Sequence, residues 1–81
     1  MILSVLVKHS FSLAGHRTSV ALEAEFWTEL RRIAQRRGQT LAALVAAVDA
    51  ARQPHRPLAS ALRVTALLAN QTGSSATDRT G

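Results

Sequence analysis

Three histidines are the residues best suited to acid–base or metal chemistry near neutral pH, and they stand at positions 9, 16 and 55. No two of them lie three or four residues apart, the spacing that brings ligands together on one face of a helix. The chain has no cysteine, which removes thiolate ligands and disulfides. A zinc site needs about four histidine, cysteine or carboxylate ligands close together. We therefore expect no metal site and no metal cofactor.

A hydrolytic triad is also hard to build from this sequence. Ser19, His16 and Asp49 supply the residue types, but almost any chain does. Such chemistry needs a cleft that excludes water and donors for an oxyanion, and 81 residues leave little room for both. The four glycines are isolated, so no glycine-rich phosphate loop is present. We therefore expect no catalytic residue, no cofactor and no enzyme activity.

The charge of the chain favours an anionic partner. Ten basic residues, nine of them arginine, face five acidic ones, and the net charge is +5 with a pI near 11.7. Nucleic acid, an acidic protein and a lipid surface are the candidate partners. No segment reaches the roughly 18 apolar residues that span a bilayer, and the apolar segment 1–7 has no basic residues before it, unlike a secretory signal. We expect a cytoplasmic protein with no membrane partner.

An alternating pattern predicts a strand over residues 16–22. Arg17, Ser19 and Ala21 would lie on one face, and Thr18, Val20 and Leu22 on the other, because successive strand side chains point to opposite faces. Residues 9–13 alternate in the same way, and Ala14-Gly15 between the two segments has the composition of a turn.

Helical periodicity begins at Glu23 and predicts a helix over 23–37, with Phe26 and Leu30 on its apolar face. Gly38 would end this helix, and Thr40 would cap a second one over 41–52 that is rich in alanine. Pro57 would begin a third helix over 57–69. We expect an apolar extension over 1–7, one domain over 8–69 and a flexible tail over 70–81.

The strand at 16–22 needs a partner, since a lone strand leaves two rows of backbone groups unpaired. Segment 8–13 could fold back on it as a hairpin, or the same strand of a second copy could pair with it about a two-fold axis. A domain this small that lacks disulfides gains stability from self-association. We therefore favour pairing with a second copy and an intertwined dimer.

The order of strand, helix, glycine and threonine-capped helix resembles the ribbon-helix-helix (Arc/MetJ-type) family. Residues 17–26 (RTSVALEAEF) and 34–45 (AQRRGQTLAALV) carry the resemblance. Residues 14–19 (AGHRTS), 25–27 (EFW), 49–52 (DAAR) and 58–64 (LASALRV) extend it to a subgroup of short bacterial members with an added third helix. The resemblance implies a mostly helical α+β fold and a homodimer that places a two-stranded antiparallel ribbon in the major groove of DNA.

Carried over by position, the resemblance assigns roles to several residues. Arg17, Ser19 and Ala21 would face the bases, and Thr40 with the backbone N–H groups of Leu41 and Ala42 would hold a phosphate. The dimer core would consist of Thr18, Val20, Leu22, Phe26, Leu30, Ile33, Leu41, Leu44, Val45 and Val48. The family often has a longer polar residue in place of Ala21. It also often has a proline in place of Glu23, and the Glu23 carboxylate would lie near the DNA.

The remaining charged and aromatic residues are interpreted as structural. Arg31, Arg32, Arg36 and Arg37 would form a solvated basic face on the helix over 23–37. Trp27 would cover the edge of that helix or the dimer seam. Asp49 would pair with Arg52, and Arg63 would join them in an ion-pair cluster.

Two functions follow from these expectations. The first is a homodimeric, sequence-specific DNA-binding protein, a small transcriptional regulator. The second is a protein-interaction or oligomerisation module on the same scaffold, antitoxins included, without specific reading of DNA. There the helix over 57–69 would dock a protein partner or close a tetramer.

Overall fold

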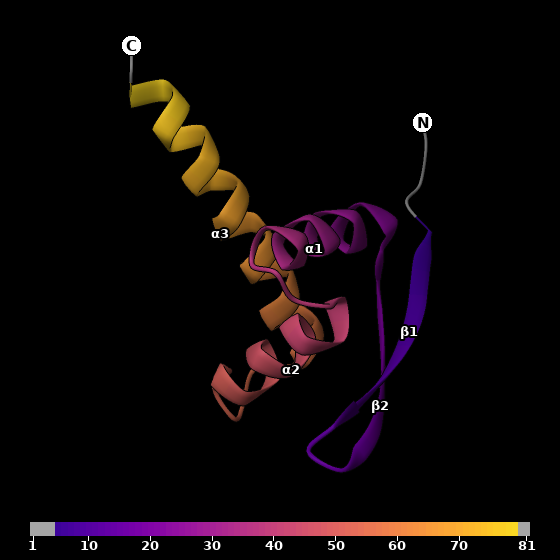
Figure 1. Ribbon diagram of the computed structural model, residues 1–81. Coiled ribbons are helices and arrows are strands. Elements are labelled where there is room, and N and C mark those ends of the chain that lie inside the picture. The colour runs from indigo at the N-terminus through magenta and orange to yellow at the C-terminus, as the bar shows by residue number, and fades with distance from the viewer. Residues whose placement is uncertain (1–4, 80–81) are drawn as a thin grey trace.

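The computed structural model describes residues 5–79, without the side chains of 71–79. Two strands, β1 (Leu6–Leu13) and β2 (His16–Glu23), precede three helices, α1 (Ala24–Arg36), α2 (Leu41–Ala51) and α3 (Leu58–Arg79). Figure 1 shows the strands as a long twisted hairpin beside the helices. This arrangement confirms the predicted mostly helical α+β fold, with an antiparallel ribbon followed by three helices.

The partner of β2 is β1 of the same chain, not the second copy that the sequence analysis favoured. The two strands pair antiparallel with Leu13 opposite His16 and Leu6 opposite Glu23. Ala14 and Gly15 both have positive φ, 51° and 82°, as in the two-residue turns whose twist matches that of a hairpin. The turn, together with an alternating first strand, lets one chain complete the ribbon alone. β1 begins at Leu6, two residues before its predicted start at 8.

Local signals place the first two helices close to their predicted limits. α1 ends at Arg36, and Gly38 follows in the left-handed region at φ 68°. Thr40 caps α2, because its hydroxyl oxygen accepts a hydrogen bond from the backbone N–H of Ala43 at 3.0 Å.

Helix α3 differs most from its prediction. It begins at Leu58, directly after Pro57, and its helical segment extends to Arg79 rather than ending at 69. The predicted flexible tail over 70–81 therefore lies partly in this helix, while residues 80–81 are outside the described part. Of the predicted extension over 1–7, residues 6 and 7 belong to β1, and residues 1–4 are outside the described part.

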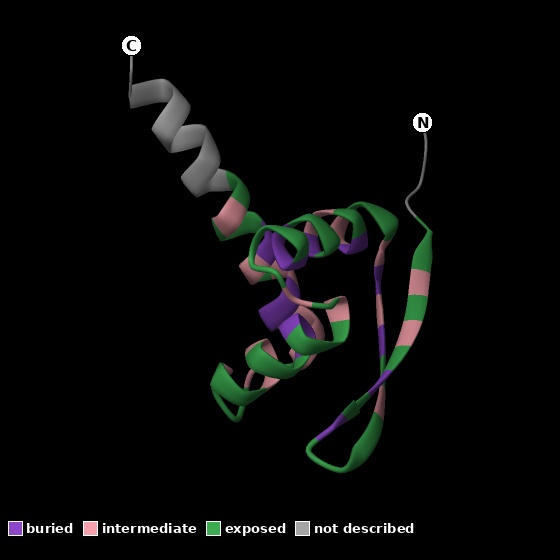
Figure 2. Cartoon of the chain, in the orientation of Figure 1, coloured by how far each residue is buried: buried purple, intermediate pink, exposed green. Residues whose placement is uncertain are grey.

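The hydrophobic core lies between the inner face of the hairpin and the three helices, as the buried positions in Figure 2 indicate. Its members are Phe11, Leu13, Val20, Leu22, Trp27, Leu30, Ile33, Ala34, Leu44, Val45, Leu62 and Ala66. Every element thus contributes to one cluster. In the described part of the chain, no helix combines the length and apolar composition that crossing a membrane requires.

Trp27 belongs to this core, which corrects its predicted place at a helix edge or dimer seam. The side chain is 1 % exposed, and its indole N–H donates a hydrogen bond to the carbonyl oxygen of Val7 at 2.7 Å. The ring also meets the His9 imidazole edge to face, with centroids 4.6 Å apart. Because β1 folds back over α1, Trp27 rather than Phe26 faces the interior, and Phe26 is only partly buried.

Candidate nucleic-acid interface

The hairpin presents one polar face to solvent, which we call the outer ribbon face. It consists of the alternate residues Lys8, Ser10, Ser12, Arg17, Ser19 and Ala21. The strand register places Lys8 opposite Ala21. All six are exposed except Ala21, which is half-buried. Since the inner face is fixed to the core, side chains of the outer ribbon face point away from the helices.

Hydroxyls lie at the centre of this face and cations lie at opposite ends of it. Ser10 and Ser19 are paired across the strands, and their Oγ atoms are 3.0 Å apart. Arg17 lies next to the turn, whereas Lys8 lies toward the other end of the hairpin. Neither cation forms an ion pair or a hydrogen bond with another side chain among the described residues. Both remain available to an anionic or hydrogen-bonding ligand.

The inner face holds the residues that the sequence analysis placed in a dimer core. Val20 and Leu22 are 5 % and 0 % exposed, and Thr18 is half-buried. Leu30, Ile33, Leu44 and Val45 are also buried, while Phe26, Leu41 and Val48 are partly buried against them. A single chain therefore buries these residues with its own elements, and their contact with a second copy stays a prediction.

Glu23 stands at the end of β2 nearest the helices, where Arg63 of α3 holds its carboxylate. The Arg63 Nε and Nη2 atoms donate to Glu23 Oε1 at 3.0 and 2.9 Å. A hydrogen bond from its own backbone N–H, then the hydrogen bond from Arg63, lower the pKa of Glu23 below its ordinary value. The Arg63 guanidinium also lies 5.7 Å from the centroid of the Phe26 ring.

This contact corrects the ion-pair cluster predicted for Asp49, Arg52 and Arg63. Asp49 does pair with Arg52, whose Nε lies 2.9 Å from Oδ1. Arg52 then donates to the backbone oxygen of Arg56 at 2.8 Å, whereas Arg63 turns to Glu23. Position 23 is 40 residues from Arg63 in sequence, so spacing along a helix could not reveal the pair.

The N-terminus of α2 offers the donors predicted for a phosphate. Thr40 and Ala42 are exposed, and Leu41 is half-buried. The first N–H groups of a helix lack partners within it and lie at the positive end of its dipole. The Thr40 hydroxyl already accepts from Ala43, so it can donate its own hydrogen to an anion without releasing the cap. Phosphate binding here stays a prediction.

A family model described as "Ribbon-helix-helix domain" matches residues 6–69. The chain belongs to the ribbon-helix-helix family. No curated protein and no solved structure matches it. Ribbon-helix-helix domains generally serve as DNA-binding regulators or antitoxins, typically dimerise, and are typically not enzymes.

Arginines on α1 of this ribbon-helix-helix chain are partly engaged with neighbours. Arg32 and Arg36 lie 3.9 and 4.0 Å from the Glu29 carboxylate, and Arg31 lies 3.4 Å from the His9 ring nitrogen. Arg37 makes none of these contacts among the described residues. Exposed pairs of this kind contribute little to stability, which agrees with a solvated basic face. Within the described part, no three His, Asp or Glu side chains gather as a metal site requires.

Half of the outer ribbon face, namely Lys8, Ser10 and Ser12, was not predicted from the sequence. Their alternation with His9 and Phe11 was visible, but the partner strand was assigned to a second copy. The Ala14-Gly15 turn was the signal that could have placed them beside Arg17 and Ser19.

Proposed function

We propose that this protein is a homodimeric, sequence-specific DNA-binding protein, a small transcriptional regulator that inserts its ribbon into the major groove. The observation that carries the proposal is the outer ribbon face, whose six residues are polar or small and include two unengaged cations, with the exposed Leu6 beyond its end. The opposite face is fixed to the core, so the polar face is rigid and open. Membership of the family supports the same function.

The dimensions of the hairpin suit the major groove. Two paired strands lie about 4.8 Å apart, and the groove of about 12 Å admits a two-stranded ribbon. Arg17 would donate two hydrogen bonds to guanine, and the Ser19 hydroxyl would bond to a base edge. Ala21 would contact a thymine methyl group, and Lys8 would approach a phosphate.

A dimer would present two hairpins to two half-sites. Ala42, Ala46 and Ala50 form an exposed stripe on α2, and small side chains let two helices approach closely. We propose this stripe as the dimer seam, which leaves both ribbons free. Two-fold symmetry then predicts an inverted-repeat site with half-sites about one helical turn apart. Family members are typically cytoplasmic, and a cytoplasmic location is part of the proposal.

The second candidate is the protein-interaction module, antitoxins included. Val64 and Leu67 of α3 are 37 % and 52 % exposed, which leaves apolar surface outside the core. Two results together would favour this candidate over DNA binding. Protein partners would still be recovered with the full chain after nuclease treatment, and no DNA sequence would be selected.

The deciding experiment selects bound sites from a random double-stranded oligonucleotide pool and compares Arg17→Ala with the natural chain. We expect an inverted repeat, and we expect Arg17→Ala to lose about 1–3 kcal/mol of affinity and its preference at one base pair. Arg36→Ala, which removes a cation from α1, should change affinity little. Affinity should fall steeply as salt is raised, because bound phosphates release counterions. Absence of any enriched sequence would contradict the proposal.

A further inference from the structure

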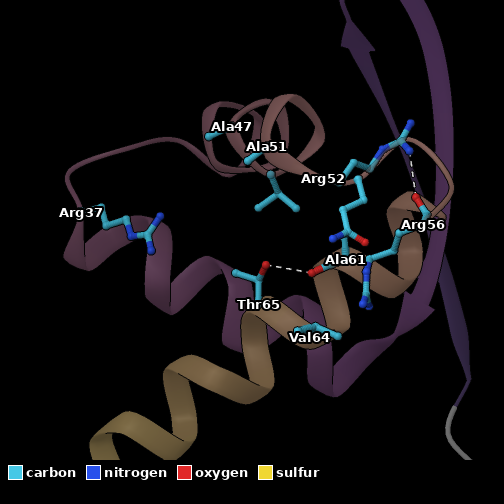
Figure 3. A pocket seen from close by; sticks show the side chains of 10 residues that line it. Arg37, Ala47, Ala51, Arg52, Arg56, Ala61, Val64 and Thr65 are labelled. Carbon is cyan, nitrogen blue, oxygen red and sulfur yellow. Dashed lines mark hydrogen bonds between the residues drawn. The ribbon is translucent and has the colours of Figure 1, made fainter.

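A groove runs between α2 and α3 on the helical side of the molecule (Figure 3). Its volume is about 550 Å³. The lining residues are Arg37, Ala47, Val48, Ala51, Arg52, Gln53, Arg56, Ala61, Val64 and Thr65. Ala47, Ala51 and Val64 are exposed, so this is an open groove with small apolar walls rather than an enclosed cavity. Neither the proposed ribbon contacts nor the proposed dimer seam uses it.

Arginines lie at both ends of the groove, and no acidic residue lines it. Figure 3 shows Arg37 at one end, with Arg52 and Arg56 at the other. Arg52 is held by Asp49 and by the Arg56 backbone, and Arg56 donates to the Ser60 hydroxyl at 3.3 Å. These contacts fix two of the cations in place. The third, Arg37, forms no side-chain hydrogen bond or ion pair among the described residues.

Charge decides among the occupants of this groove. A second copy also carries +5, and its Glu23, Glu29 and Asp49 already face arginines of their own chain. A DNA backbone would gain nothing from the apolar walls, and a flat lipid surface does not fit a concave site. A small molecule bound here would stay largely exposed, unlike ligands of enclosed pockets.

We infer that the groove binds an amphipathic helix of a partner protein that has acidic residues flanking its apolar face. Small alanines on both walls let a helix backbone approach closely. The apolar residues of the partner would lie against Ala51, Ala61 and Val64, as in other helix-in-groove complexes. Its carboxylates would meet Arg37 and Arg56, since Arg52 is already paired with Asp49. Because the outer ribbon face points away from the helices, DNA and this partner can bind the same chain together.

The test uses fluorescein-labelled designed peptides and fluorescence anisotropy with the full chain. The first peptide is a helix with leucines on one face and glutamates flanking them. The second has lysines in place of the glutamates, and the third has the composition of the first with the leucine periodicity scrambled. We expect only the first peptide to bind. Equal binding of the second or third, or no binding of the first, overturns the inference.

Matched variants locate the binding. Ala51→Glu should weaken binding of the first peptide about tenfold or more, because it places a negative charge in the groove next to the glutamates of the peptide. Gln35→Glu adds the same charge on α1, outside the groove, and should leave binding unchanged. Arg37→Gln, which would remove one exposed ion pair with the peptide, should weaken binding about twofold to fivefold, and Arg36→Gln should not. An unchanged affinity in both groove variants overturns the inference. Light scattering gives a second check. If the groove variants lose the dimer mass and their controls keep it, a second copy occupies the groove and the inference is overturned.

Discussion

At the scale of single residues, Arg63 holds the glutamate with which β2 ends. The Arg63 guanidinium bonds to the Glu23 carboxylate and lies over Phe26. A free carboxylate at the end of the ribbon would repel DNA phosphates. Paired with Arg63, Glu23 instead ties the ribbon to α3.

The lowered pKa of Glu23 predicts a dependence of stability on pH. A carboxyl group whose pKa is lower in the folded than in the unfolded state stabilises the fold above its ordinary pKa. That contribution disappears as pH falls through the lowered pKa of the folded state. Thermal unfolding from pH 7 down to pH 2 should therefore show a loss of stability that is smaller in Glu23→Gln.

Thr40 has two separable roles. Thr40→Ala removes the hydrogen bond to the Ala43 N–H, so we expect a loss of about 1 kcal/mol in the free energy of unfolding. Urea titration measures this loss, and Thr40→Ser should restore most of it because the hydroxyl remains. If the α2 N-terminus also holds a phosphate, Thr40→Ala weakens binding equally for preferred and unrelated DNA. A loss confined to the preferred sequence would contradict that role.

At the scale of elements, the hairpin depends on its turn. Ala14 has φ 51°, a left-handed conformation that disfavours alanine and that asparagine tolerates. Asn-Gly is the preferred pair in such turns. We expect Ala14→Asn to stabilise the fold by up to about 1 kcal/mol, seen as a higher midpoint of thermal unfolding.

Gly15→Ala is the opposing control for the turn. An added Cβ would meet no atom within 4 Å, but φ is 82°. The cost is therefore conformational alone, and we expect a loss of about 1 kcal/mol. If the ribbon formed between two copies instead, no tight turn would be needed, and neither substitution would move the midpoint.

At the scale of the whole molecule, one chain forms its ribbon and core without residues from a second copy. Dimerisation is therefore not required to pair β2. We expect light scattering to give twice the 8.7 kDa mass of the chain. Ala46→Glu on the exposed stripe of α2 should reduce this to a single mass while circular dichroism stays unchanged. A single mass for the natural chain would contradict the dimer.

The sequence by itself determined the features that depend on near neighbours. The alternation of Arg17 and Ser19 with Val20 predicted the two faces of β2, and Gly38 with Thr40 predicted the break between α1 and α2. These signals are local, because strand alternation, positive φ and helix capping involve residues a few positions apart.

Only the tertiary structure decided which distant segments meet. It paired β1 with β2, brought Arg63 to Glu23, and turned Trp27 rather than Phe26 into the core. The energy of burial depends on what packs over each side chain, and a periodic pattern does not specify its partner. The alternation of β2 is therefore a local pattern, whereas the choice between β1 and a second copy as its partner was settled only in the folded chain.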